Sequence, residues 1–267
     1  MTVEIATKNL NVQLGTFHLN DATIDIPKGK MTAIIGPNGS GKSTLLKALT
    51  QLVGTNTGSI SIKEKDIHDY KRKEFARTVA MLPQSKQSFP NLTVQELIAY
   101  GRSPYKRFFE KTSLGHDQEI IQWAMEITNT QKHADRLFHT LSGGEQQKVR
   151  IALALAQKTD ILLLDEPTTF LDVTHQIELM ELLEQIQRKF SMTIVMVLHE
   201  LQQAATYCDY VITVKNGSIR AAGNPVDLLT SAFIKDIYNI DVKILFDDGL
   251  PLIIPVKGQF HKTRLEI

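Results

Sequence analysis

A glycine-rich stretch between two apolar runs constrains the fold of this chain more than any other feature. The run 31–35 before it is apolar, and the run 45–49 after it favours a helix, so the order strand, glycine loop, helix is predicted. Glycines at this spacing allow consecutive backbone N–H groups to point inward at an anion. The residues expected to surround that anion are Gly36, Pro37, Asn38, Gly39, Ser40, Gly41, Lys42, Ser43 and Thr44.

Two side chains at the end of this loop favour a nucleoside triphosphate as the ligand. A helix that begins near Lys42 presents unpaired amides and a partial positive charge to phosphate groups. The Lys42 ammonium can reach terminal phosphoryl oxygens, and the Ser43 hydroxyl can bind Mg2+. A glycine-rich turn without a ligand is the alternative, and the strand before the loop and the helix after it count against that alternative.

The composition is that of an ordinary globular protein, and its net charge does not favour nucleic acid as a partner. A length of 267 residues with 42% apolar residues suits one large domain, or a domain with a subdomain. The 30 basic and 29 acidic residues give a net charge of +1, which offers no electrostatic case for binding nucleic acid. The single cysteine, Cys208, excludes an intrachain disulfide and fits a reducing compartment.

Neither a signal peptide nor a membrane-spanning run is expected. The first residues lack a basic start and a long apolar core, and nowhere do about 18 apolar residues run together. We therefore expect a cytoplasmic chain that does not itself cross a membrane. A role in transport would need separate membrane-spanning partners.

Alternating and apolar runs predict several strands. Apolar and polar residues alternate over 10–14 and 22–26, which indicates antiparallel strands that lead into the strand before the loop. A further strand is predicted over 78–82, with Gln84 just past its end. Near the end of the chain, a hairpin is expected to turn at 247–249.

Two later apolar strands carry polar side chains at their ends. Asp165 and Glu166 end the strand predicted over 161–167, and His199 follows the strand predicted over 193–198. Open parallel sheets bind ligands at the carboxyl ends of their strands, where carboxylates suit a metal and a general base. On their own, the two carboxylates could equally cap a following turn, and a lone histidine at a strand end is usually structural.

A helical pattern replaces the strands from about residue 89 to residue 141 and predicts a helical subdomain. The sequence Leu-Ser-Gly-Gly-Glu then opens a helix that runs to about residue 157. Ser142 is the expected N-cap, and Glu145 stands three residues on, in the position of a capping box. The two glycines between them, Gly143 and Gly144, are expected to leave backbone amides uncovered for an anion.

Taken together, these motifs resemble the nucleotide-binding subunit of an ATP-binding cassette (ABC) transporter over nearly the whole chain. The phosphate loop, Gln84, the signature 141–145, the pair at 165–166 and His199 occur in the family order. The resemblance implies an α/β P-loop NTPase with a RecA-like core, an antiparallel β subdomain and a helical signature subdomain.

The resemblance also divides the single ABC ATPase domain, 1–267. Residues of about 1–88 and 160–240 would form the catalytic core with the β subdomain, 89–159 the helical subdomain, and 241–267 a C-terminal hairpin. Within the family, the chain looks like the importers of ferric siderophores, haem and cobalamin, most of all those of ferric siderophores. The motifs that carry this likeness are 99–105, 165–172 with His175 and Gln176, and 241–243.

The resemblance implies roles at the matching positions. Lys42 and the loop amides would hold the β- and γ-phosphates of ATP. Ser43 and Asp165 would bind Mg2+ directly or through water, and Gln84 would also contact the metal site. Glu166 would be the general base for the attacking water, and His199 would position the γ-phosphate and Glu166, with Gln84 sensing the metal and the water.

Two chains of such a family pair head to tail, so each ATP would lie between the phosphate loop of one chain and the signature of the other. Ser142, Gly143 and Gly144 would face the partner's ATP, and Asp172 would reach across to the partner's site. Further expected partners are a transmembrane permease and, indirectly, an extracellular substrate-binding protein. The permease would dock in a groove formed from Gln84 to about residue 109, with Phe89, Pro90 and Leu92 as contacts.

Two positions depart from the family pattern. Leu14 stands where the family usually has an aromatic residue that stacks on adenine, with Phe17 and His18 nearby as substitutes. Glu200 follows His199 where these importers commonly have aspartate. The other histidines show no metal-ligand spacing and are expected on the surface or in packing; they are His18, His68, His116, His133, His139, His175 and His261.

The sequence therefore predicts the ATP-hydrolysing subunit of an importer for a ferric-siderophore-type iron chelate, at the cytoplasmic face of the membrane. An importer ATPase for haem or cobalamin is the alternative. A soluble cassette ATPase acting on ribosomes or DNA is less favoured, because the chain has a single cassette, no long coiled-coil insertion and almost no net charge. An ATP-binding regulator without turnover is disfavoured by the intact Glu166.

Overall fold

The computed structural model describes residues 2–84, 91–106 and 114–256. The strands, in chain order, are β1 (Val3–Leu14), β2 (Phe17–Pro27), β3 (Met31–Ile35), β4 (Thr57–Ile62), β5 (Lys65–Asp66), β6 (Val79–Leu82), β7 (Ile161–Asp165), β8 (Thr193–Val197), β9 (Tyr210–Lys215), β10 (Ser218–Gly223), β11 (Val242–Asp247) and β12 (Leu250–Pro255).

The α-helices are α1 (Lys42–Leu49), α2 (Arg72–Thr78), α3 (Val94–Ala99), α4 (Leu114–Ile127), α5 (Gly143–Ala156), α6 (Val173–Phe190), α7 (Leu201–Tyr207), α8 (Pro225–Leu228) and α9 (Ser231–Tyr238). The described residues also contain the short 3-10 helices η1 (Ile67–Asp69), η2 (Tyr100–Tyr105), η3 (Gln131–His133) and η4 (Phe138–Thr140). Among the described ranges, no helix is both long and apolar enough to cross a membrane.

The strands form three sheets. The central sheet has the order β10-β9-β3-β8-β7-β6, in which β10 alone runs antiparallel to its neighbour. The antiparallel sheet has the order β2-β1-β4-β5, and β11 pairs with β12 in a hairpin. This confirms the α/β fold class, the antiparallel strands before the phosphate loop and the hairpin that turns near residue 248.

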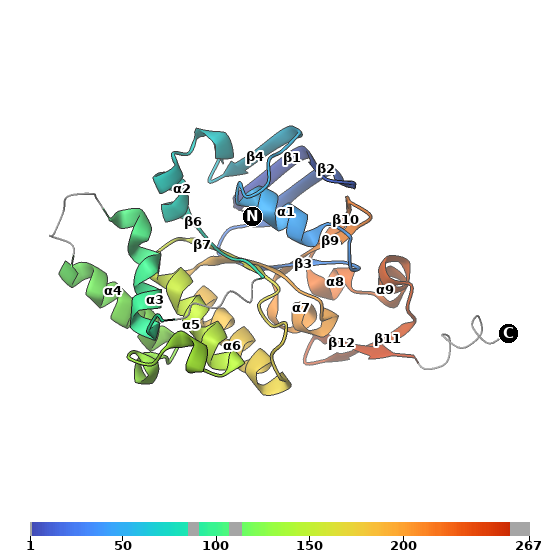
Figure 1. Ribbon diagram of the computed structural model, residues 1–267. Helices are drawn as coiled ribbons and strands as arrows, with labels where there is room; N and C mark the ends of the chain where they lie inside the picture. The colour runs from blue at the N-terminus through green and yellow to red at the C-terminus, as the bar shows by residue number, and fades with distance from the viewer. Residues whose placement is uncertain (1, 85–90, 107–113, 257–267) are drawn as a thin grey trace, which may run out of the picture.

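The central strands are buried on both faces because their side chains alternate between two layers of core. In β7, Leu162 and Leu164 belong to the core formed with the helices, while Ile161 and Leu163 belong to the core formed with α1 and the antiparallel sheet. Figure 1 shows this layering, with α1 between the antiparallel sheet and the central sheet and with α5 and α6 on the opposite side.

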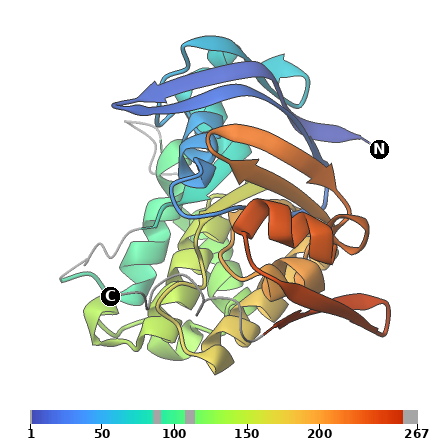
Figure 2. The same cartoon turned by 90° about the vertical axis from the view of Figure 1, so that its right-hand side faces the viewer.

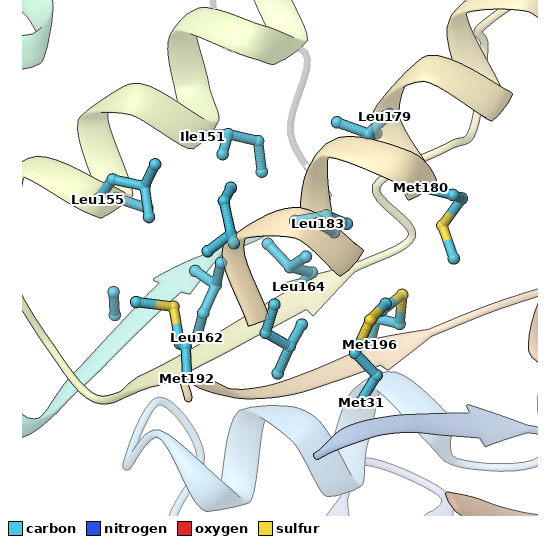
Figure 3. Close-up of a cluster of buried hydrophobic side chains, with 14 of the residues drawn as sticks. Met31, Ile151, Leu155, Leu162, Leu164, Leu179, Met180, Leu183, Met192 and Met196 are labelled. Carbon is cyan, nitrogen blue, oxygen red and sulfur yellow. The ribbon is translucent and has the colours of Figure 1, made fainter. Parts of the chain in front are cut away.

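Figure 3 shows the helix side of this core, where α5 and α6 lie over the strands. Ile151 and Leu155 of α5 and Leu183 of α6 are each at most 1% exposed. Burying side chains of this size contributes about 1.5–3 kcal/mol each. A single buried cluster thus includes α3, α4 and α5 together with β7, β8 and α6. The division into a catalytic core and a helical subdomain stays a prediction.

The C-terminal hairpin is held against α7 by one glutamine side chain. Gln202 Nε2 donates to the Pro251 carbonyl oxygen at 3.1 Å, and the Ile253 N–H donates to Gln202 Oε1 at 3.0 Å. Both bonds are made by backbone groups of β12. In Figure 2 the hairpin projects beside α7 and away from the antiparallel sheet.

Candidate functional site

Four parallel strands of the central sheet bring the predicted site residues to one edge. The phosphate loop follows β3, and Gln84 lies two residues beyond the end of β6. Asp165 is the last residue of β7 with Glu166 directly after it, and His199 lies two residues beyond β8. The expectation that these side chains lie at the carboxyl ends of neighbouring strands is therefore confirmed by the topology.

Lys42 is enclosed by the loop that precedes it. Its side chain is buried, and Nζ donates to the carbonyl oxygens of Gly36 at 2.9 Å and Pro37 at 3.0 Å. Burial lowers the pKa of Lys42, while the carboxylates of Glu166 and Asp165 act in the opposite direction. The ammonium is thus fixed at the start of α1 and beside two carboxylates, where a phosphate chain would meet both the cation and the helix N-terminus.

Ser43 and Asp165 form a pair of oxygen donors next to the loop. Ser43 Oγ donates to Asp165 Oδ1 at 2.8 Å, and Asp165 is only 4% exposed. Burial raises the pKa of the Asp165 carboxyl, and the hydrogen bond from Ser43 partly offsets that rise. A hydroxyl and a carboxylate at this distance fit Mg2+, which is usually held by one or two carboxylates together with substrate phosphates.

A complete metal cage built from side chains is absent from the described parts of the chain. No group of three or more histidine, cysteine, aspartate or glutamate side chains there could hold a metal ion.

Glu166 is contacted through both carboxylate oxygens. His199 Nε2 lies 2.5 Å from Oε1, while Gln84 Nε2 and the Thr169 hydroxyl donate to Oε2, the latter at 3.1 Å. The backbone of Glu166 is left-handed, with φ 54°, a conformation that costs about 1–3 kcal/mol and clusters at functional sites. Three side chains from three different loops thus fix one carboxylate at the sheet edge.

Two pockets meet at Glu166. One of about 330 Å³ opens over the phosphate loop and is lined by Phe17, Asn38, Gly39, Gly41, Lys42, Ser43, Thr44, Glu166 and His199. The other, of about 260 Å³, is lined by Leu82, Pro83, Gln84, Gln147, Arg150, Asp165, Glu166, Pro167, Thr169 and Phe170. Glu166 therefore stands between a phosphate-binding loop and the residues that follow β6.

Phe17 lies against the phosphate loop itself. A side chain at Gly41 would place its Cβ 2.6 Å from Phe17 Cζ, and Gly41 has φ 108°. Glycine is therefore required at 41 by both the backbone conformation and the ring. Leu14, at the position the family gives to an aromatic residue, is 49% exposed and does not line this pocket in the described chain.

The signature forms the N-terminus of α5 as predicted. Ser142 is the N-cap; its backbone N–H donates to Glu145 Oε2 at 2.9 Å, and the Glu145 N–H donates to Ser142 Oγ at 3.4 Å. The first of these bonds is the main reason that the pKa of Glu145 lies below its usual range. His133 Nε2 lies 3.1 Å from Glu145 Oε1 and supports the same turn.

The two signature glycines have different surroundings. Gly143 is exposed, and a Cβ there would meet no atom of the described residues within 4 Å. Gly144 is buried, and the space of its Cβ is filled by the His175 ring. The expectation that these two glycines leave backbone amides uncovered for an anion stays a prediction, because the contact at Gly144 concerns the space of a side chain and not its N–H.

Asp172 caps α6 close to this turn. Its Oδ1 accepts from the His175 N–H at 2.9 Å and lies 2.8 Å from His175 Nδ1. These bonds, the backbone one first, lower the pKa of Asp172. Among the described residues, neither Asp172 nor the signature residues 142–144 line the pocket over the phosphate loop of their own chain.

The motif 99–105 is structural in this chain. The buried Arg102 donates through Nε to Asp117 Oδ1 and through Nη1 to the Ala156 carbonyl oxygen, both at 2.8 Å. The Tyr105 hydroxyl donates to the Gln157 carbonyl oxygen at 3.0 Å. These bonds join η2 to α4 and to the end of α5, so this family-like motif anchors helices.

Only part of the expected permease groove can be described. Phe89 and Pro90 lie outside the described residues. Leu92 is partly buried against the helical core, and its carbonyl oxygen accepts from the Phe138 N–H at 2.9 Å.

A partly buried amide network next to Glu200 had no signal in the sequence. Gln203 Nε2 donates to Gln176 Oε1 at 2.8 Å and to Glu200 Oε2 at 3.0 Å, and the Thr168 hydroxyl donates to Gln203 Oε1 at 3.1 Å. The network joins the segment after β8 to the segment between β7 and α6. It depends on tertiary contacts between α6 and α7, and the glutamine spacing alone does not reveal it.

Comparisons with known proteins identify the family of this chain. The family model described as ABC transporter matches residues 19–169. Over 244 residues, covering 91% of this chain and 90% of the relative, the chain is 40% identical to the iron(3+)-hydroxamate import ATP-binding protein FhuC of Bacillus subtilis (strain 168). Over 236 residues, 88% of this chain and 87% of the relative, it is 42% identical to the ferric enterobactin transport ATP-binding protein FepC of Escherichia coli (strain K12).

A solved structure of a bacterial ABC transporter cassette, MJ0796 in dimeric form, matches with a TM-score of 0.71 and 25% identity. The match covers 83% of this chain and 98% of that chain. The resemblance inferred from the spaced motifs is thereby confirmed, and the chain belongs to the ABC transporter family as one of its ATP-binding subunits.

Proposed function

We propose that this chain hydrolyses ATP to power the import of a ferric-siderophore-type iron chelate through a separate transmembrane permease. The observation that carries the chemistry is the position of Glu166. Its carboxylate borders the pocket over the phosphate loop and contacts His199, Gln84 and Thr169. A carboxylate held in this way at the sheet edge suits a general base for hydrolysis.

The surrounding residues divide the remaining tasks. Lys42 and the loop amides bind the β- and γ-phosphates, and the ring of Phe17 offers the apolar face nearest the loop for the adenine base. Glu166 accepts a proton from the water that attacks the γ-phosphorus. His199 orients the carboxylate through the oxygen that Gln84 does not contact, and Gln84 links the carboxylate to the chain that follows β6.

Ser43, Asp165 and Gln84 would hold Mg2+ in this proposal. When bound, the ion supplies charge neutralisation at the phosphate oxygens. The support is the oxygen donor pair of Ser43 and Asp165 together with the lack of a full protein cage in the described chain.

In this proposal a second copy of the chain completes the site. The signature residues Ser142, Gly143 and Gly144 and the capping residue Asp172 contribute to the ATP site of the partner. Two observations support this: these residues are absent from the described lining of the phosphate pocket of their own chain, and a related cassette is dimeric. ATP would then stabilise the closed dimer by contacts that only that state offers.

The names of the relatives support the proposed cargo and the proposed membrane partner. Two relatives named for different iron chelates match at 40% and 42% identity over about nine-tenths of this chain. Because the two identities are nearly equal, they favour ferric chelates as the class of cargo and do not select one chelate. The chain would work at the cytoplasmic face of the membrane, bound to the permease and served indirectly by an extracellular binding protein.

Mixed variants test the shared site. A Ser142→Arg chain and a Lys42→Ala chain are each expected to be inactive, but their heterodimer contains one intact composite site. Mixing them should therefore restore ATP hydrolysis to at most half of the wild-type rate. As a control, the double variant Lys42→Ala/Ser142→Arg mixed with Ser142→Arg offers no intact site and should remain inactive. No recovery in the first mixture would contradict the shared site.

A further inference from the structure

The second glycine of the signature is in close contact with a histidine from another helix. A Cβ built on Gly144 would lie 2.0 Å from His175 Cδ2, 2.6 Å from Cγ and 2.7 Å from Nε2. Carbon atoms in ordinary contact are about 3.5–4.0 Å apart, so the imidazole occupies the space that any side chain at 144 would need. The ring and the glycine are therefore complementary in shape.

Asp172 holds the ring in this position. One oxygen of its carboxylate accepts both the His175 N–H and, at 2.8 Å, the Nδ1 side of the ring. An ionised carboxylate only accepts hydrogen bonds, so Nδ1 is the donor in this contact when Asp172 is ionised. The orientation of the imidazole is thus set by the N-cap of α6, and the ring bridges that cap and the first turn of α5.

The contact continues along the two helices. One turn further on, Lys148 Nζ lies 2.6 Å from Glu178 Oε2. Beyond that pair, Ile151 of α5 and Leu179 of α6 are fully buried in the same cluster. The helices lie next to each other over the strands (Figure 3). His175 is therefore the first contact of a continuous packing of α5 against α6, at the end where the signature lies.

We propose that His175 is a positioning residue that sets the signature turn relative to Asp172. The ring fixes the distance between the first turn of α5 and the N-cap of α6, so Ser142, Gly143 and Asp172 approach a partner as one unit. Glycine is required at 144 because His175 occupies the side-chain space. This inference rests on the proposed function only in assigning those residues to the partner's site.

A pair of single substitutions and their combination test the proposal. Gly144→Ala should lower the rate of ATP hydrolysis at least tenfold, because the new methyl group displaces the ring. In a His175→Ala background the same Gly144→Ala change should cause less than a twofold further loss, because the space is already free. Equal losses in both backgrounds would overturn the proposal, since glycine would then be needed for its backbone.

The single variant His175→Ala separates positioning from folding. Its ATP affinity, measured with a fluorescent ATP analogue on the isolated chain, should stay within twofold of wild type, because the phosphate loop is untouched. Its kcat should fall at least tenfold, and His175→Asn, whose amide can still donate to Asp172, should recover part of that loss. A wild-type kcat for His175→Ala would overturn the proposal.

Thermal unfolding without nucleotide tests the packing independently of ATP hydrolysis. Gly144→Ala should lower the unfolding temperature in the wild-type background and much less in the His175→Ala background. Gly143→Ala serves as the matched control for this measurement only, because its Cβ would meet no described atom within 4 Å. If the wild-type chain hydrolyses no ATP, the proposed function fails while this cycle still decides the packing. A Gly144→Ala penalty that is the same in both backgrounds would reject the contact.

Discussion

Replacing Glu166 by glutamine separates its chemistry from its structural contacts. In the native chain Oε2 accepts from Gln84 and Thr169, and Oε1 faces His199. The glutamine oxygen can keep both donors, and its amide can donate to His199 Nε2 when the ring proton is on Nδ1. Since each contact finds a substitute, we expect the free energy of unfolding to change by no more than about 1 kcal/mol.

The cost to catalysis should be much larger. A positioned general base contributes about 10²–10⁴-fold, which corresponds to about 2.7–5.4 kcal/mol in the barrier at about 1.36 kcal/mol per tenfold. We therefore expect kcat for phosphate release at saturating Mg-ATP to fall by that factor. ATP affinity should remain within a few-fold, because Lys42 and the loop amides are unchanged. A dimer should accumulate in size-exclusion chromatography with ATP.

A carboxylate outside the site provides the control. Glu184 of α6 pairs with Arg188 on the surface, and Glu184→Gln should leave the rate of hydrolysis unchanged. Turnover by Glu166→Gln within threefold of wild type would refute the assignment of the general base. A large loss of ATP affinity with normal unfolding would instead mean that Glu166 acts mainly in binding.

Three further predictions use other parts of the chain. Phe17→Ala should raise the KM for ATP about three- to tenfold, the range expected for one aromatic stacking contact, whereas Leu14→Ala should change it less than twofold; equal effects would remove Phe17 from the adenine contact. Burial raises the pKa of the Asp165 carboxyl, so this carboxyl binds its proton more tightly in the folded chain than in the unfolded chain. The folded chain therefore loses stability as the pH rises through this raised pKa. Asp165→Asn keeps an amide oxygen that accepts from Ser43, and it should raise the unfolding temperature at pH 7 while lowering Mg-dependent hydrolysis. A lower unfolding temperature would contradict the prediction that the ionised Asp165 carboxylate destabilises the fold. Cys208 is buried and burial raises the pKa of its thiol, so a thiol reagent should modify it at a rate that follows global unfolding in denaturant; rapid labelling of the folded chain would contradict this burial.

The sequence predicts those parts of the site that depend on local chemistry. The phosphate loop, the strand ends that carry Asp165 and His199, and the capping box of Ser142 and Glu145 can be recognised because each is determined by neighbouring residues. The edge of a parallel sheet then brings the strand ends together without further information. The order of the sheet strands, in contrast, emerged only from the pairing in the structure.

The remaining contacts depend on residues that are distant in sequence. The reason for glycine at 144 is a ring 31 positions later, and neither helical periodicity nor glycine spacing predicts that ring. The contact of Phe17 with Gly41 likewise links the antiparallel sheet to the loop. Leu14 shows the opposite case. It stands at the sequence position where the resemblance leads us to expect an adenine-stacking residue, but it is not among the described residues that line the pocket.

Uptake of radioactive iron by cells shows whether hydrolysis at this site drives the import of a ferric chelate. Cells that carry either the wild-type chain or Glu166→Gln at equal abundance would be supplied with iron bound to hydroxamate or catecholate siderophores. Glu166→Gln should abolish uptake of at least one of these chelates, while the purified variant still binds ATP. Unchanged uptake of every ferric chelate by the Glu166→Gln cells would contradict the claim that hydrolysis at this site drives iron-chelate import.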